Sequence, residues 1–151
     1  MDYWLLKSEP DSYSIDDLAQ QEVGHWDGVR NFQARNNLMA MKVGDLAFFY
    51  HSSTDPPGVA GVCRVVKEAY PDHTQFDPGS KYFDPKSSPE RPRWYMPEVE
   101  FVEKFARLIP LGELRETPGL EDMELLRRSR LSVQHVTPEQ WKIITAIAEG
   151  A

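Results

Sequence analysis

The chain has 151 residues, a hydrophobic fraction of 40% and a formal net charge of −7 at pH 7. This length suits one domain with one core, and four Trp, seven Phe and six Tyr can fill that core, so global disorder is excluded. The negative charge argues against a protein that coats nucleic acid indiscriminately, because such binding depends on many Lys and Arg that displace counterions from phosphates. Basic residues cluster in 30–42, 81–93 and 127–130, which fits either a basic face or ordinary solvated surfaces.

The first residues lack the basic region and the apolar region of roughly 7–15 residues that a signal peptide requires. No run of about 18 apolar residues predicts a membrane span. We therefore expect a cytoplasmic monomer with no membrane partner. The single Cys63 cannot form an internal disulfide, and its place in the apolar run 59–66 predicts a buried core thiol rather than a reactive one.

The N-terminal third is expected to contain a strand and two helical segments. Residues 3–9 form an aromatic and aliphatic run that ends at a proline, which predicts a strand. Residues 16–21 suit one or two helical turns, with Ser14 or Asp16 as the N-cap. Residues 31–41 contain no helix breaker, so a second helix is expected there.

The middle of the chain has strand character interrupted by a long loop. Residues 45–52 predict a strand, and the turn at 55–58 joins it to another at 59–69, so the two should form a hairpin. Residues 71–92 are rich in Pro, Asp, Ser and Lys, which predicts a mobile loop with few buried contacts. Residues 93–105 return to strand character.

The C-terminal part combines short helices with one more strand. We expect helices at 111–116 and 120–128 and a strand at 131–133. Thr137 and Gln140 form the pattern of a capping box at the start of a final helix, with Pro138 at its first position. Together these elements predict one α+β domain, residues 1–151, with a small, mainly antiparallel, curved sheet or barrel surrounded by short helices.

Familiar catalytic and cofactor motifs are missing from the sequence. The four histidines are too scattered for a zinc-binding helix, so no metal is expected. There is no nucleophile elbow, no phosphate loop and no dinucleotide fingerprint, so we expect neither a cofactor nor catalytic residues. His51 and Ser52 are adjacent in a strand and should point to opposite faces, which argues against an esterase-like pair.

Residues 25–36 carry an unusual mixture of side chains. An indole, a carboxylate, two guanidiniums and three side-chain amides surround Gly28. An indole provides a flat surface on which a base can stack, amides can pair with the edge of that base, and guanidiniums can hold phosphate. The segment predicts a ligand pocket, although Trp26 would equally serve as a core residue beside an ordinary turn at 27–28.

The sequence resembles the EVE-domain family, which belongs to the PUA-like superfamily. The resemblance rests on blocks that extend over nearly the whole chain in the expected order: residues 3–10, 26–36, 44–52, 82–84, 92–94, 130–133 and Trp141. It implies a PUA-like curved mixed sheet or pseudo-barrel. It also implies kinship with the YTH domain, which encloses a methylated base of RNA in an aromatic cage. By analogy, the partner would be a modified base, such as a modified cytosine, in DNA or RNA.

Carried over residue by residue, the resemblance implies a base-binding pocket lined by Lys7, Ser8, Trp26, Arg30, Asn31, Tyr50, His51, Ser52, Leu131 and Ser132. Trp26 would stack on the base, and Asn31 and Ser8 would bond its edge. Lys7 or Arg30 would attract a phosphate or another anion.

Each of these assignments has a structural alternative. Lys7 could be a surface strand residue, Tyr50 a core ring, and Arg30 an ion-pair partner of Asp27. The leading hypothesis is a non-catalytic reader that takes one unpaired or flipped modified base into the Trp26 pocket. The alternatives are a protein or enzyme that uses His51 or Lys7 on a nucleotide or small anionic metabolite, and an adaptor that binds a peptide.

Overall fold

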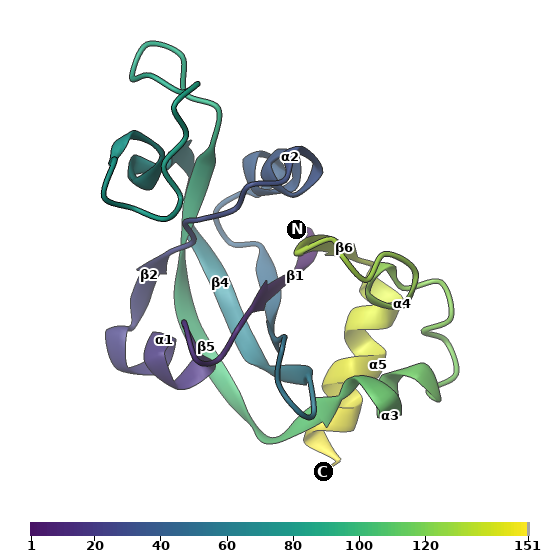
Figure 1. Ribbon diagram of the computed structural model, residues 1–151. Coiled ribbons are helices and arrows are strands. Elements are labelled where there is room, and N and C mark those ends of the chain that lie inside the picture. Colours follow the sequence, from purple (N-terminus) through teal and green to yellow (C-terminus); the bar gives the residue numbers. More distant parts are fainter. Residues whose placement is uncertain (151) are drawn as a thin grey trace.

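The structure, a computed structural model that describes residues 1–150, is built on a six-stranded sheet in the order β2-β5-β4-β3-β1-β6 (Figure 1). Among the strands within residues 1–150, only β1 and β3 run parallel, so the predicted α+β fold with a mainly antiparallel sheet is confirmed. The sheet does not close, because β2 and β6 remain its two edges. The elements are β1 (Tyr3–Ser8), α1 (Ile15–Gln21), β2 (Val23–His25), α2 (Phe32–Ala40), β3 (Leu46–His51), β4 (Gly58–Pro71), the 3-10 helix η1 (His73–Phe76), β5 (Tyr95–Pro110), α3 (Leu111–Arg115), α4 (Glu124–Arg127), β6 (Val133–Val136) and α5 (Pro138–Glu149).

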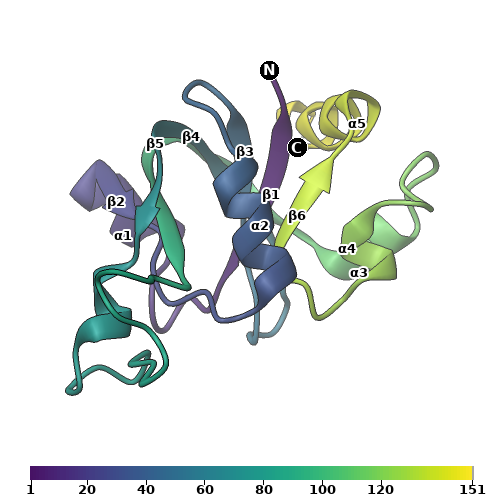
Figure 2. The same cartoon turned by 90° about the horizontal axis from the view of Figure 1, so that it is seen from above.

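Both faces of the sheet are buried, because helices pack on each of them. Successive side chains of a strand point to opposite faces. Trp4 and Leu6 of β1 pack on one face with α1 and α2, whereas Leu5 packs on the other with α3, α4 and α5. Figure 2 shows α2 and α5 on opposite sides of the sheet. Cys63 of β4 is fully buried, and this burial raises the pKa of its thiol to about 12, which confirms the predicted core thiol. In the described part of the chain, no helix is long and apolar enough to cross a membrane.

Helix starts follow local hydrogen-bonding chemistry. Ser14, rather than Asp16, caps α1, and it forms a capping box with Asp17. Thr137 and Gln140 form the predicted capping box of α5: the Gln140 backbone N–H donates to Thr137 Oγ1 at 3.2 Å, and the Thr137 N–H donates to Gln140 Oε1 at 3.0 Å. Each box satisfies two backbone N–H groups that the helix leaves unpaired.

Two short strands differ from the sequence-based expectation. β2 was not predicted, because three residues give too little periodicity to read, and it exists through its pairing with β5. The last strand lies at Val133–Val136 rather than at 131–133, because its partner β1 sets the register by placing Val133 opposite Leu6. Tertiary pairing decides both cases.

The loop 71–92 is held more firmly than the sequence suggested. Asp72 and Gln75 are fully buried, so the expectation of few buried contacts is wrong for its first turn. The Gln75 side-chain amide donates to the carbonyl oxygens of Asp72 and Trp94, and its Oε1 accepts the N–H groups of Arg93 and Trp94. The buried Gln75 amide thereby links the start of the loop, at Asp72, to the residues that follow its end, Arg93 and Trp94.

The capping box of α5 allows a direct stability test. Thr137→Ala removes the hydroxyl that accepts the Gln140 N–H, so we expect the free energy of unfolding to fall by about 1 kcal/mol. Thr137→Ser keeps the hydroxyl and should lie close to wild type. Urea unfolding of the three proteins measures the difference, and equal stability of the Ala and Ser variants would contradict the cap.

Candidate functional site

The candidate site lies at the C-terminal ends of β1 and β3, the parallel pair of strands. Parallel strands end at the same side of a sheet, and the register places Lys7 beside Tyr50 and Ser8 beside His51. β6 runs antiparallel to β1, so the residues that precede β6 lie beside the C-terminal end of β1. There the Lys7 N–H donates to the Ser132 carbonyl at 2.9 Å. Three sequence-distant segments therefore meet.

A cavity of about 970 Å³, here called the main cavity, opens at these strand ends. The segment between β2 and α2 and the loop 81–82 complete its walls. Seven of the ten predicted site residues line it: Lys7, Ser8, Trp26, Arg30, Tyr50, Ser52 and Ser132. Whether each of these contacts a ligand stays a prediction.

The structure does not bring the other three predicted residues into this cavity. Asn31 and Leu131 line a second, smaller cavity of about 360 Å³. The Asn31 side chain caps α2 by accepting the Ala34 N–H at 2.9 Å. His51 lines neither cavity: its Nε2 accepts the Ile15 N–H at 3.1 Å, and burial lowers the pKa of the ring. The ten predicted residues therefore do not all line one cavity, and whether Asn31, His51 and Leu131 contact a ligand stays a prediction.

Trp26 is both a core residue and a wall of the main cavity. Only 7% of its surface is exposed, and its ring meets Phe49 nearly edge-on, with centroids 5.3 Å apart. Tyr13 packs against it in a second edge contact at 6.2 Å. The two readings of this indole therefore describe one side chain, which the core fixes in orientation while part of it lines the cavity.

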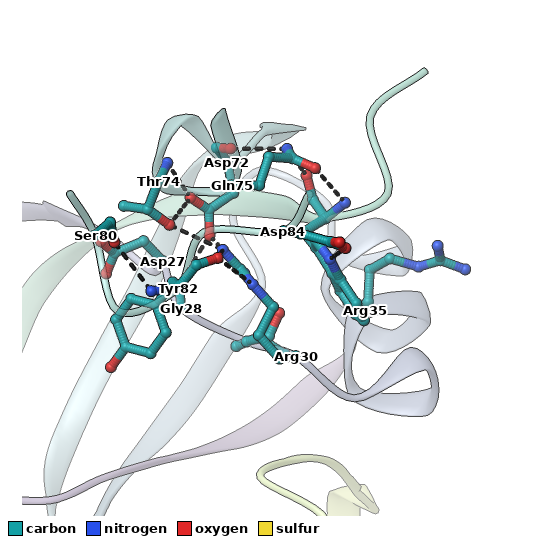
Figure 3. A network of polar contacts seen from close by, with 12 residues as sticks. Asp27, Gly28, Arg30, Arg35, Asp72, Thr74, Gln75, Ser80, Tyr82 and Asp84 are labelled. Atoms are coloured by element: carbon teal, nitrogen blue, oxygen red, sulfur yellow. Dashed lines mark hydrogen bonds and ion pairs between the residues drawn. The ribbon is translucent and has the colours of Figure 1, made fainter. Parts of the chain in front are cut away.

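Arg30 lines the main cavity and is also bound by the protein itself, so a contact with phosphate stays a prediction. Its guanidinium donates to Asp72 Oδ2 at 3.1 Å, to Thr74 Oγ1 at 3.0 Å and to the Tyr82 carbonyl at 2.7 Å. The ion-pair partner is thus Asp72 and not Asp27. Figure 3 shows how this one side chain links the segment that precedes α2 to the long loop.

Asp72 is the centre of this network and is fully buried. Burial raises the pKa of its carboxyl, but hydrogen bonds from Thr74, Gly28 and Arg30 outweigh that effect, so the pKa is lowered overall. The Gly28 N–H donates to Asp72 Oδ2 at 2.8 Å. Gly28 has a φ of +79°, and a Cβ there would lie 2.7 Å from the Tyr82 ring, so the close approach of this ring requires glycine.

Lys7 and Ser8 are held by hydrogen bonds at the end of β1. Lys7 Nζ donates to the Ser129 carbonyl at 2.8 Å and lies 5.6 Å from the centroid of the Tyr50 ring. Its partial burial lowers the pKa of the ammonium. Ser8 Oγ donates to the Tyr13 carbonyl at 2.7 Å, which leaves its oxygen lone pairs to accept a hydrogen bond from a ligand.

The cavity lining is basic and aromatic, although the chain is acidic. Five lysine and arginine side chains line it against two carboxylates, on a chain with a net charge of −7. Sequence reasoning missed part of this lining, namely Tyr13, Tyr82, Lys81, Arg115 and Arg130. Of these, Tyr82 and Arg130 stand in the blocks that carry the family resemblance, which was the available signal. The lining suits a planar, partly polar ligand that carries negative charge.

Metal chemistry finds no support in the residues that the structure describes. Within 1–150, no three His, Cys, Asp or Glu side chains come together as a possible metal site. His25 lines the main cavity; its Nε2 lies 3.8 Å from Asp27 Oδ2, and its ring meets that of His73 with centroids 5.1 Å apart.

Comparison with known proteins identifies relatives along the whole chain. A family model described as "EVE domain" matches residues 2–147. Human thymocyte nuclear protein 1 is 46% identical over 166 residues, covering 97% of this chain and 74% of the human protein. A hypothetical protein from Leishmania major has a TM-score of 0.97 and 49% identity, with 99% and 96% of the two chains covered. The human THYN1 protein, crystallised in complex with DNA containing 5-methylcytosine, has a TM-score of 0.93 and 45% identity, with 99% and 98% covered.

Because the pKa of Asp72 is lowered in the folded protein, the free energy of unfolding should decrease at acidic pH. Asp72→Asn leaves the Arg30 guanidinium without its counter-ion, so we expect the free energy of unfolding at pH 7 to fall by about 3 kcal/mol. The native pKa of Asp72 lies below its ordinary value of 3.8, so the carboxylate contributes fully above that value and loses its contribution as the pH falls through the native pKa. Urea unfolding at a series of pH values should therefore show a wild-type advantage that is constant near neutrality and shrinks in acid.

Asp122→Asn provides the matched control. Asp122 pairs with Arg127 at 3.1 Å, but its side chain is 90% exposed, so its loss should change stability little. Equal destabilisation by the two substitutions would contradict the central role of the buried pair.

Proposed function

Because the chain belongs to the EVE domain family, we propose that it binds nucleic acid and reads a modified cytosine held in the main cavity. The observation that carries this proposal is the basic and aromatic lining of the cavity on an acidic chain. Positive charge gathered at one site of an acidic chain favours a polyanion at that site and disfavours indiscriminate coating. The complex of human THYN1 protein with 5-methylcytosine-containing DNA supports the same ligand class.

The size of the cavity supports a nucleotide rather than a small metabolite. At about 970 Å³ it lies at the upper end of the range of roughly 300–1,000 Å³ for ligand pockets. A base with its sugar and phosphate fits this space better than a base alone. The base must leave its stack to enter, which costs a few kcal/mol and restricts binding to single strands or flipped positions.

Rigid rings and fixed hydrogen-bonding groups give the pocket its means of recognition. We assign Trp26 the stacking role, because the edge contacts with Phe49 and Tyr13 hold its ring in place. Ser8 is the candidate acceptor for the exocyclic amino group of a cytosine, since its hydroxyl already donates to the protein. A preorganised pocket loses little entropy on binding, so it can discriminate a single methyl group.

The contacts of the candidate catalytic groups support binding without catalysis. His51 accepts a backbone N–H through Nε2, and Lys7 donates to the Ser129 carbonyl. Among residues 1–150 neither forms an ion pair with a carboxylate, and burial outweighs the effect of Asp16 on His51, so the pKa of that ring is lowered. The alternative of an enzyme or small-metabolite binder is favoured by no particular contact in the cavity.

The reading role of Trp26 can be tested against a second, equally buried tryptophan. Trp26→Ala should lower affinity for an oligonucleotide carrying 5-methylcytosine by about 1–3 kcal/mol at every salt concentration, because stacking depends little on salt. Trp141 is 8% exposed and packs on Phe48, outside both cavities. Trp141→Ala should therefore cost stability without changing the affinity of the folded protein.

Binding is measured by titration of single-stranded and duplex oligonucleotides with plain, methylated or hydroxymethylated cytosine, below the unfolding temperature of each variant. We expect wild type to prefer a modified cytosine over its plain counterpart. No such preference would sink the proposed reader, and equal affinity of the two tryptophan variants would remove Trp26 from the reading site.

A further inference from the structure

The second cavity adjoins the first and is walled by arginines. Its lining includes Arg127, Arg128 and Arg130 from the end of α4 and the turn that follows, and Asn31 and Gln33 from the start of α2. No acidic side chain lines it. Ser129 and Arg130 line both cavities, so the two spaces share one wall.

Hydrogen bonds from side chains of β1 and β6 hold the backbone of the turn 128–131, here called the arginine turn. Gln134 is fully buried, and its Nε2 donates to the carbonyl oxygens of Arg128 at 3.0 Å and Leu131 at 2.9 Å. Lys7 Nζ donates to a third carbonyl of the turn, that of Ser129, at 2.8 Å. Two side chains from the sheet thus bind three of the four carbonyls of the turn, which fixes its backbone beside the two cavities.

The three arginines differ in how free their charge is. Arg127 binds the Glu121 carbonyl and the Asp122 carboxylate. Arg128 lies 3.7 Å from Glu124. Arg130 is exposed and makes no ion pair with any residue of 1–150. The uncompensated guanidinium is therefore the one that stands between the two cavities.

We propose that the second cavity is a phosphodiester subsite, in which Arg130 binds the backbone phosphate adjacent to the nucleotide in the main cavity. This inference rests on the proposed function and assigns the backbone contact to Arg130 rather than to Arg30, whose guanidinium donates to groups of the protein. A guanidinium binds phosphate oxygens through two parallel N–H groups, and Arg128 adds charge to the same space. Lys7 then acts as a positioning residue, because it contacts the main cavity and holds the arginine turn.

The test removes the charge from the protein and from the nucleic acid separately. Arg130→Gln is compared with Lys142→Gln, which removes the same charge from an exposed position of α5 outside both cavities. The probe is a single strand with one 5-methylcytosine, either unmodified in its backbone or with one neutral methylphosphonate. That substitution is placed next to the modified base or four nucleotides away.

We expect Arg130→Gln to weaken binding about five- to tenfold at low salt and to reduce the salt slope by about 0.7, the value for one phosphate of a single strand. Lys142→Gln should do neither. The adjacent methylphosphonate should weaken wild type by a similar factor and have no further effect on Arg130→Gln, because each change removes the same contact. The distant methylphosphonate should affect both proteins alike.

Two outcomes overturn the subsite: equal behaviour of the Arg130 and Lys142 variants, or additive effects of Arg130→Gln and the adjacent methylphosphonate. The preference for methylated over plain cytosine is measured on the same proteins and should be unchanged by Arg130→Gln, since a backbone contact carries no base identity. If wild type shows no such preference while the methylphosphonate effects hold, the reader function falls and the phosphate subsite remains.

Discussion

The buried ion pair between Arg30 and Asp72 is the constraint on which the site depends. It joins the segment before α2 to the loop after β4, two stretches that share no strand pairing. Asp72 also binds Gly28, and the Arg30 guanidinium binds the Tyr82 carbonyl, so one pair positions both the turn that follows Trp26 and the ring that lies on it. A buried pair of this kind is weak evidence for stability but strong for geometry, because its hydrogen bonds allow few alternative arrangements.

The parallel pairing of β1 with β3 positions the rest of the site. Because β1 and β3 are parallel, their ends meet, and the turn before β6 joins them from the other side. Helices lie on both faces of this sheet (Figure 2), and the cavity opens at the ends of its strands. Residues from the first ten, the middle and the last twenty-five positions thereby line one space.

Charge is distributed in a way that reconciles an acidic protein with an anionic ligand. An overall charge of −7 disfavours nonspecific attraction to a polyanion, while lysines and arginines line the two cavities to which we assign the ligand. The basic groups fall into two kinds. Arg30 and Lys7 donate hydrogen bonds within the protein, whereas Arg130 forms no ion pair with any residue of 1–150.

The sequence alone determined most of the fold and part of the site. The aromatic and aliphatic run of β1, the hairpin of β3 and β4 and the capping box of α5 are local signals, and the motif blocks contain Lys7, Ser8, Trp26 and Tyr50, which line the main cavity. Only the tertiary structure decided the partner of Arg30, the withdrawal of His51 from the cavity and the division of the site in two. The physical reason is that these outcomes depend on contacts between residues such as 30 and 72, whose separation along the chain carries no periodic or capping signal.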